Sequence, residues 1–212
     1  MRPDAVVNAA YAQTDWESTA DGAAHVALAT AGNGARLVHV SSDAVFSGGA
    51  VHYAETAVPD PVSPYGAAKA AAETAVRAIS PGAAIVRTSL IIGGRGSAHE
   101  RRVHALATGE ATGVLFTDDV RCPVHVHDLA AALVELASSD HAGVHHVAGP
   151  DAVSRHELGT LIARRDGLDP DVLPAGRRSD AGLSGPVDVR LDCTLTRRRL
   201  RTRPRGAREF LG

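Results

Sequence analysis

The chain has 212 residues, enough for one full-sized hydrophobic core with a smaller lobe. A formal charge of −2 gives no basic excess, so we expect neither a nucleic-acid partner nor a membrane partner. Two cysteines are too few for a disulfide framework or a zinc site, and no apolar run of about 18 residues occurs. The composition therefore predicts a cytoplasmic protein.

Strands and helices are predicted to alternate along the first half of the chain. The apolar run at 4–10 predicts a buried strand, 17–31 a helix that ends at glycines, and 36–41 a second strand. Ser63 is placed to cap an alanine-rich helix, and 83–93 reads as one further strand. This alternation is typical of a parallel sheet with both faces covered.

The second half continues the alternation. Asp128 is predicted to cap a helix with leucines on one stripe, and 143–149 is a last short strand. A capping box of Ser154 and Glu157 predicts another helix.

Two segments depart from this regular pattern. Residues 94–120 and 149–188 are richer in Gly, Pro and charge than the rest of the chain. We expect them to form a small irregular C-terminal substrate lobe over the carboxyl ends of the strands, where ligands of open α/β sheets bind. The fold class predicted is therefore α/β, a single domain over residues 1–212.

Lys69 is the only lysine among 22 lysines and arginines. Tyr65 lies four residues earlier, so the two side chains share one face of the predicted helix. A nearby ammonium favours the phenolate and is expected to lower the pKa of Tyr65 into a range useful for acid–base catalysis. The alternative is an accidental pair on a solvated helix face.

Several motifs together resemble a known family. The chain resembles the extended short-chain dehydrogenases/reductases, most closely those of the dTDP-4-dehydrorhamnose reductase type. The resembling stretches are RPDAVVNAA (2–10), LVHVSSDAVFSG (37–48), PYGAAK (64–69), VRTSLIIG (86–93), PVHVHDLA (123–130) and GVHHVAG (143–149).

The resemblance implies a Rossmann-like sheet and an NAD(P)-dependent reduction of a keto group on a sugar nucleotide or related small molecule. Tyr65 would protonate the carbonyl oxygen and Ser42 would hold it, while Lys69 would lower the pKa of Tyr65 and bind the nicotinamide ribose. Tyr65 would also contact the cofactor, and Ala9 and Ala10 would leave room for it. A homodimer is usual in this superfamily.

The Gly-rich turn that holds the cofactor pyrophosphate in this family has no match here, because neither GNGARL nor GGRGSAH fits G-x-G-x-x-G. Relative to the family, we expect an N-terminally truncated sheet. The start of the chain could be assigned too late, the chain could be a short form that lost the cofactor, or another polypeptide could supply the missing half. The residue that would distinguish NADH from NADPH would lie in that half.

Two other functions stay open on the sequence. The same fold serves as a non-catalytic regulatory module in the beta subunit of methionine adenosyltransferase, and the superfamily also includes epimerases and lyases. Ala44 and Leu90 stand where the reductases often carry an aromatic residue, which bears on the identity of the sugar nucleotide. We assign no metal site, since His125 and His127 are interpreted as structural, and the arginines of 197–208 as a solvated helix end.

Overall fold

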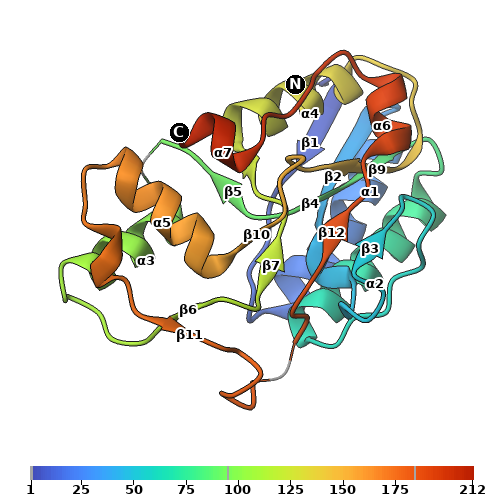
Figure 1. Ribbon diagram of the computed structural model, residues 1–212. Coiled ribbons are helices and arrows are strands. Elements are labelled where there is room, and N and C mark those ends of the chain that lie inside the picture. The colour runs from blue at the N-terminus through green and yellow to red at the C-terminus, as the bar shows by residue number, and fades with distance from the viewer. Residues whose placement is uncertain (1, 95, 184) are drawn as a thin grey trace.

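The computed structural model describes residues 2–94, 96–183 and 185–212 (Figure 1). Met1, Arg95 and Ser184, which fall within the predicted domain, lie outside the described residues. In the part described, a parallel sheet has the strand order β1-β2-β4-β9. These strands are β1 (Ala5–Asn8), β2 (Arg36–Ser42), β4 (Ala84–Thr88) and β9 (Gly143–Val147).

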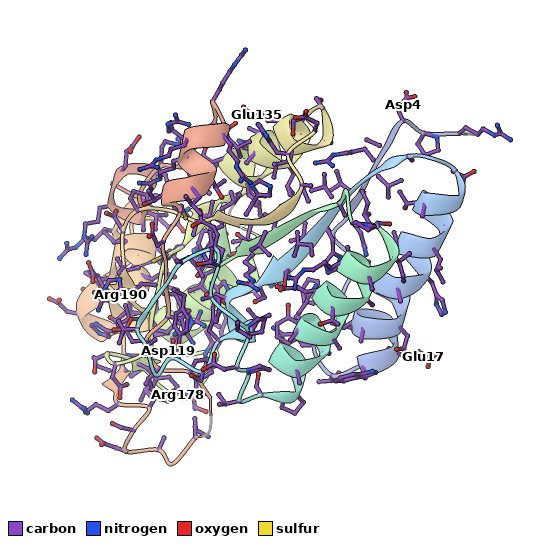
Figure 2. All side chains as sticks on the ribbon, turned by 90° about the vertical axis from the view of Figure 1, so that its right-hand side faces the viewer. Asp4, Glu17, Asp119, Glu135, Arg178 and Arg190 are labelled. Atoms are coloured by element: carbon purple, nitrogen blue, oxygen red, sulfur yellow. The ribbon has the colours of Figure 1, made fainter. Side chains whose placement is uncertain are left out.

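Helices cover both faces of this sheet, as the alternation predicts. The helices α1 (Gly22–Gly32) and α2 (Pro64–Ile79) lie side by side on one face (Figure 2), and α4 (Val126–Ala137) covers the other. On β2, Leu37 packs into the cluster formed with α1 and α2, whereas its neighbour Val38 packs against α4. Successive side chains of a strand point to opposite faces, so both are buried.

The predicted lobe has its own hydrophobic cluster, separate from the sheet. It is built around α3 (Ala98–Ala107), β6 (Leu115–Phe116) and α5 (Arg155–Arg165), which lie apart from the sheet in Figure 1. The lobe is less irregular than the sequence suggests, because α3 begins with a complete capping box of Ser97 and Glu100.

Short elements make up the rest of the described chain. The remaining turns and helices are η1 (Glu17–Asp21), η2 (Asp43–Val45), η3 (Pro170–Val172), α6 (Thr194–Arg199) and α7 (Ala207–Phe210). The remaining strands are β3 (His52–Tyr53), β5 (Ile91–Ile92), β7 (Val120–Arg121), β8 (Val124–His125), β10 (Val153–Ser154), β11 (Ala175–Gly176) and β12 (Arg190–Leu191). No helix in the described ranges has the length and apolar character needed to cross a bilayer.

Two predictions about elements are wrong. The single strand expected over 83–93 is divided, because β4 pairs with β2 and β9 whereas β5 leaves that sheet to pair with β8. Asp128 does not cap α4. The helix begins earlier, His125 caps it by accepting a hydrogen bond from the backbone N–H of His127, and the Asp128 carboxylate binds Arg205 at 2.9 Å.

Candidate active site

Ser42 and Tyr65 come from neighbouring elements whose starts and ends are fixed by caps. Ser42 is the last residue of β2, and its hydroxyl accepts a hydrogen bond of 3.1 Å from the backbone N–H of Ala44. Tyr65 lies in the first turn of α2, which Ser63 caps as predicted by accepting from the backbone N–H of Gly66.

The two segments approach closely because position 66 has no side chain. A Cβ on Gly66 would overlap the carbonyl oxygen of Ala44. This close approach brings the Ser42 hydroxyl near enough to the Tyr65 phenol to influence its pKa, while that hydroxyl donates a hydrogen bond of 3.3 Å to the Asp43 carboxylate. Ser42 and Tyr65 thus lie near one another at the carboxyl end of β2.

The pKa of Tyr65 differs from the prediction made from the sequence. Burial raises it to about 12, Tyr11 and Asp43 act in the same direction, and only the hydrogen bond to Ser42 opposes them. The predicted lowering by Lys69 is therefore wrong in this structure, since the ammonium is directed elsewhere. Tyr65 is a neutral phenol at neutral pH and can donate a proton.

Lys69 is buried one turn further along α2, with 2% of its surface exposed. Its Nζ donates a hydrogen bond of 3.0 Å to the carbonyl oxygen of Val40 and lies 5.4 Å from the ring centroid of Tyr11. Burial lowers the pKa of Lys69 to about 8, against the opposing effect of Glu73. The Lys69 ammonium is thus held by the carbonyl oxygen of Val40 and lies against the ring of Tyr11.

Glu73 fixes α2 against the sheet. Its carboxylate accepts hydrogen bonds from Arg87 Nη2 at 2.8 Å and from Ser41 Oγ at 2.6 Å, and both members of the ion pair are 1% exposed. Because Glu73 lies four residues after Lys69, this contact orients the helix face that carries Lys69 and Tyr65.

Ala9 and Ala10 follow β1 directly and are exposed. Since β1 pairs in parallel with β2, their carboxyl ends lie at the same edge of the sheet, next to Ser42. These small exposed residues, the buried Lys69 and the half-buried Tyr65 are the residues that could hold the nicotinamide and ribose end of an NAD(P) molecule. The sequence contains no Gly-rich turn to fit the pyrophosphate.

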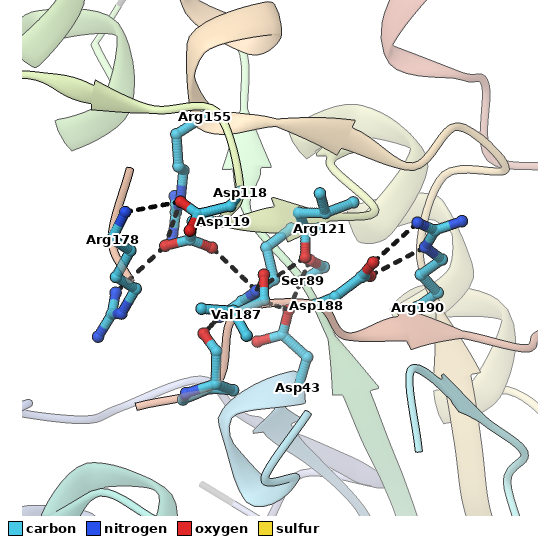
Figure 3. A network of polar contacts seen from close by, with 12 residues as sticks. Asp43, Ser89, Asp118, Asp119, Arg121, Arg155, Arg178, Val187, Asp188 and Arg190 are labelled. Atoms are coloured by element: carbon cyan, nitrogen blue, oxygen red, sulfur yellow. Dashed lines mark hydrogen bonds and ion pairs between the residues drawn. The ribbon is translucent and has the colours of Figure 1, made fainter. Parts of the chain in front are cut away.

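A network of buried charges links this edge to the lobe (Figure 3). Asp43 lies 3.6 Å from Arg121 Nε, and Arg121 Nη1 lies 2.9 Å from the carboxylate of Asp119. Asp119 in turn pairs with Arg155 at 3.4 Å and with Arg178 at 3.3 Å. Asp43, the residue after Ser42, is thus connected to Arg155 in the lobe through three successive ionic contacts.

Asp119 and Arg155 also line a pocket of about 320 Å³ between α3, β6 and α5. Most of the lining is apolar, with His99 and Arg102 as further polar members. His99 Nδ1 lies 3.3 Å from Arg155 Nη1, and burial together with that guanidinium lowers the pKa of His99 to about 4. The polar wall of the pocket therefore combines a neutral imidazole, the Asp119 carboxylate and two guanidinium groups.

Comparison with known proteins shows the family. The model described as the RmlD substrate binding domain matches residues 1–211. The chain belongs to the RmlD substrate-binding domain family.

Two relatives are longer than this RmlD-family chain. The chain is 37% identical over 184 residues to the dTDP-4-dehydrorhamnose reductase of Mycobacterium tuberculosis, covering 79% of this chain and 60% of that protein. It is 33% identical to the spore coat polysaccharide biosynthesis protein SpsK of Bacillus subtilis, covering 81% and 64%. The chain thus spans less than two thirds of either relative.

A solved structure shows the same fold. The dTDP-4-dehydrorhamnose reductase of Bacillus anthracis, in complex with NADP, superimposes with a TM-score of 0.89 at 24% identity. The match covers 99% of this chain and 79% of that one. The Rossmann-like architecture expected from the motifs is therefore confirmed.

The structure brings Ser42, Tyr65 and Lys69 together, and it adds two residues that the sequence analysis missed. The ring of Tyr11 lies against the Lys69 ammonium. A sequence signal for this residue was available, because it is an aromatic residue directly after two small ones. Nothing in the local sequence indicated the role of Asp43, because its ionic partner Arg121 is 78 positions further along this RmlD-family chain.

Proposed function

We propose that this chain carries the catalytic residues of an NAD(P)-dependent reductase acting on a keto group of a sugar nucleotide. The observation that carries the proposal is that Ser42 lies near Tyr65, with Lys69 buried one turn further along the same helix. These side chains lie at the sheet edge where ligands of open α/β folds bind, beside the exposed Ala9 and Ala10.

In this proposal Tyr65 is the general acid. Its pKa of about 12 keeps the phenol protonated until a developing alkoxide takes the proton. Ser42 donates a hydrogen bond to the same oxygen, and the Lys69 ammonium offsets the negative charge that then forms on Tyr65. The bound cofactor supplies the hydride. Lys69 and Tyr65 would hold its ribose, and Ala9 and Ala10 would allow its close approach.

The substrate would extend into the lobe formed by roughly 94–120 and 149–188. Arg102 and Arg155 line the 320 Å³ pocket against the single carboxylate of Asp119, which pairs with Arg155, so guanidinium groups are available there for the diphosphate of a sugar nucleotide. The relative from M. tuberculosis is named as a reductase of such a molecule, dTDP-4-dehydrorhamnose. NADP is the cofactor in the solved relative from B. anthracis, which favours NADP over NAD.

The arrangement of Ser42, Tyr65 and Lys69 also bears on the two rival functions. A regulatory module would have no need to bury its only lysine four residues from a tyrosine that lies near Ser42. An epimerase or lyase would use the same three side chains, and only the measured reaction separates it from a reductase. The homodimer and the cytoplasmic location stay predictions.

The test is turnover of the Tyr65→Phe variant. NADPH oxidation is followed with dTDP-4-dehydrorhamnose as substrate, and the variant is expected to lose about 10²- to 10⁴-fold in kcat because the general acid is removed. Arg77→Gln, on an exposed position of the same helix, is the control and should retain activity. Undiminished turnover by Tyr65→Phe, or none by the unaltered chain, would overturn the proposal.

A further inference from the structure

Tyr11 lies where the two helix residues of the site meet. Its ring centroid is 5.9 Å from that of Tyr65, with the planes tilted by 51°, and 5.4 Å from the ammonium of Lys69. We propose that Tyr11 is a positioning residue whose ring face holds the Lys69 ammonium in place at this end of α2. The role in positioning follows from the contacts alone, while its benefit to catalysis rests on the proposed function.

The loop that carries Tyr11 is fixed on both sides. Before it, the backbone N–H of Ala10 donates a hydrogen bond of 3.2 Å to the side chain of Asn8. After it, the hydroxyl of Thr19 donates to the carbonyl oxygen of Ala12 at 2.7 Å and accepts from its N–H at 3.0 Å. Thr19 is 1% exposed, so its two hydrogen bonds to the backbone of Ala12 are anchored in the core. The fold thus fixes the loop on both sides of Tyr11, although the residue itself is 57% exposed.

The ring supplies an interaction that the other neighbours of Lys69 do not. Glu73 faces the ammonium from the next turn of α2 but is already bound to Arg87 and Ser41. His39 on β2 is neutral, because burial and then Lys69 lower its pKa to about 4. An aromatic face attracts a cation electrostatically, and the attraction grows as the cation loses water. Tyr11 therefore favours the charged form of a lysine whose burial disfavours it.

The direction in which the pKa of Lys69 should change when the Tyr11 ring is removed can be predicted. Without the aromatic face, the charged form of Lys69 loses stabilisation, so its pKa falls further below the ordinary value. A cation–π contact of ordinary strength corresponds to about a threefold to tenfold change in proton affinity. Phenylalanine keeps the face and should keep the effect, whereas leucine should remove it.

Because Lys69 is the only lysine in the chain, its side chain can be observed alone. The protein labelled with ¹³C-lysine gives one Cε–Hε correlation, which is titrated in the unaltered protein and in Tyr11→Phe and Tyr11→Leu. We expect the unaltered Hε signal to be shifted upfield by the ring. Tyr11→Leu should abolish that shift and lower the titration midpoint, while Tyr11→Phe should preserve both. Trp16→Leu, an exposed aromatic in the same loop, is the matched control and should change neither.

The outcomes separate this proposal from the proposed function. An unaltered protein whose Hε signal lies at the random-coil position, or a Tyr11→Leu variant with the same shift and midpoint, would overturn the positioning role. A changed Lys69 signal in a protein without reductase activity would support the positioning role and contradict only the proposed function. In an active enzyme, Tyr11→Leu should move the alkaline limb of the kcat profile to lower pH.

Discussion

Gly66 has no side chain, yet it determines how closely Ser42 and Tyr65 approach. In an exposed helix, Gly→Ala stabilises a protein by about 0.4–1 kcal/mol. At position 66 the added Cβ would overlap the carbonyl oxygen of Ala44, so the first turn of α2 would have to move away from the serine loop.

We therefore predict opposite effects at two glycines. Gly66→Ala should lower the free energy of unfolding and reduce reductase activity, whereas Gly32→Ala should leave activity unchanged and raise stability slightly. Gly32 is a matched control because it lies in α1 and, among the described residues, nothing beyond its own helix backbone comes within 4 Å of the place where a Cβ would stand. Urea unfolding of both variants tests this, and a Gly66→Ala protein that is as stable and active as Gly32→Ala would contradict it.

At the level of single residues, the sequence predicted which side chains lie close together better than it predicted their pKa values. The unique lysine and its spacing from Tyr65 identified the helix face that the structure places beside Ser42. The direction of the Tyr65 pKa could not be predicted, because it depends on burial and on Tyr11, which belongs to another segment of the chain.

Among the elements, α2 is the one whose orientation determines the site. The buried pair of Glu73 and Arg87 joins it to β4, and Arg87 also donates to the carbonyl oxygen of Ala57 at 3.0 Å. Breaking a buried ion pair by removing one partner leaves an uncompensated charge and costs about 3–5 kcal/mol.

Glu73→Ala is therefore expected to lower the free energy of unfolding by about that amount, as measured in urea. The double variant Glu73→Leu/Arg87→Met should lose less than Glu73→Ala, because no buried charge is left without its partner. A Glu73→Ala cost comparable to that of an exposed substitution such as Arg77→Ala would show that the pair does not hold the helix.

The regular elements followed from apolar periodicity and caps, whereas the elements of the lobe did not. The spacing of Ser97 and Glu100 is a helix signal of the same kind as that of Ser154 and Glu157, but the surrounding glycines obscured it. The division of 83–93 depends on β5 pairing with β8, a contact with a distant segment that local sequence does not encode.

For the whole molecule, buried histidines predict a loss of stability in mild acid. His39, His145 and His146 are fully buried on the sheet strands, and burial lowers the pKa of each to about 4 from 6.5. Each is neutral in the folded protein over a range in which the unfolded chain binds a proton. The contribution of these neutral histidines to the free energy of unfolding is therefore fully present above pH 6.5 and is lost as the pH falls towards 4.

Thermal unfolding across this range is the measurement. The midpoint should fall steadily below pH 6.5, and His145→Gln should reduce the slope. His25→Gln changes an exposed histidine and should leave the slope as it is. A midpoint independent of pH between these limits would contradict the neutral state of the buried rings.

The most direct test of the central claim is to map which end of NADPH this 212-residue chain contacts. Saturation-transfer NMR with the unaltered protein should give the strongest signals on the nicotinamide and its ribose, because Lys69, Tyr65 and the two alanines lie at one sheet edge. Lys69→Met should weaken those signals most. Strongest transfer to the adenine end, or no transfer at all, would contradict the assignment of this edge as a reductase site.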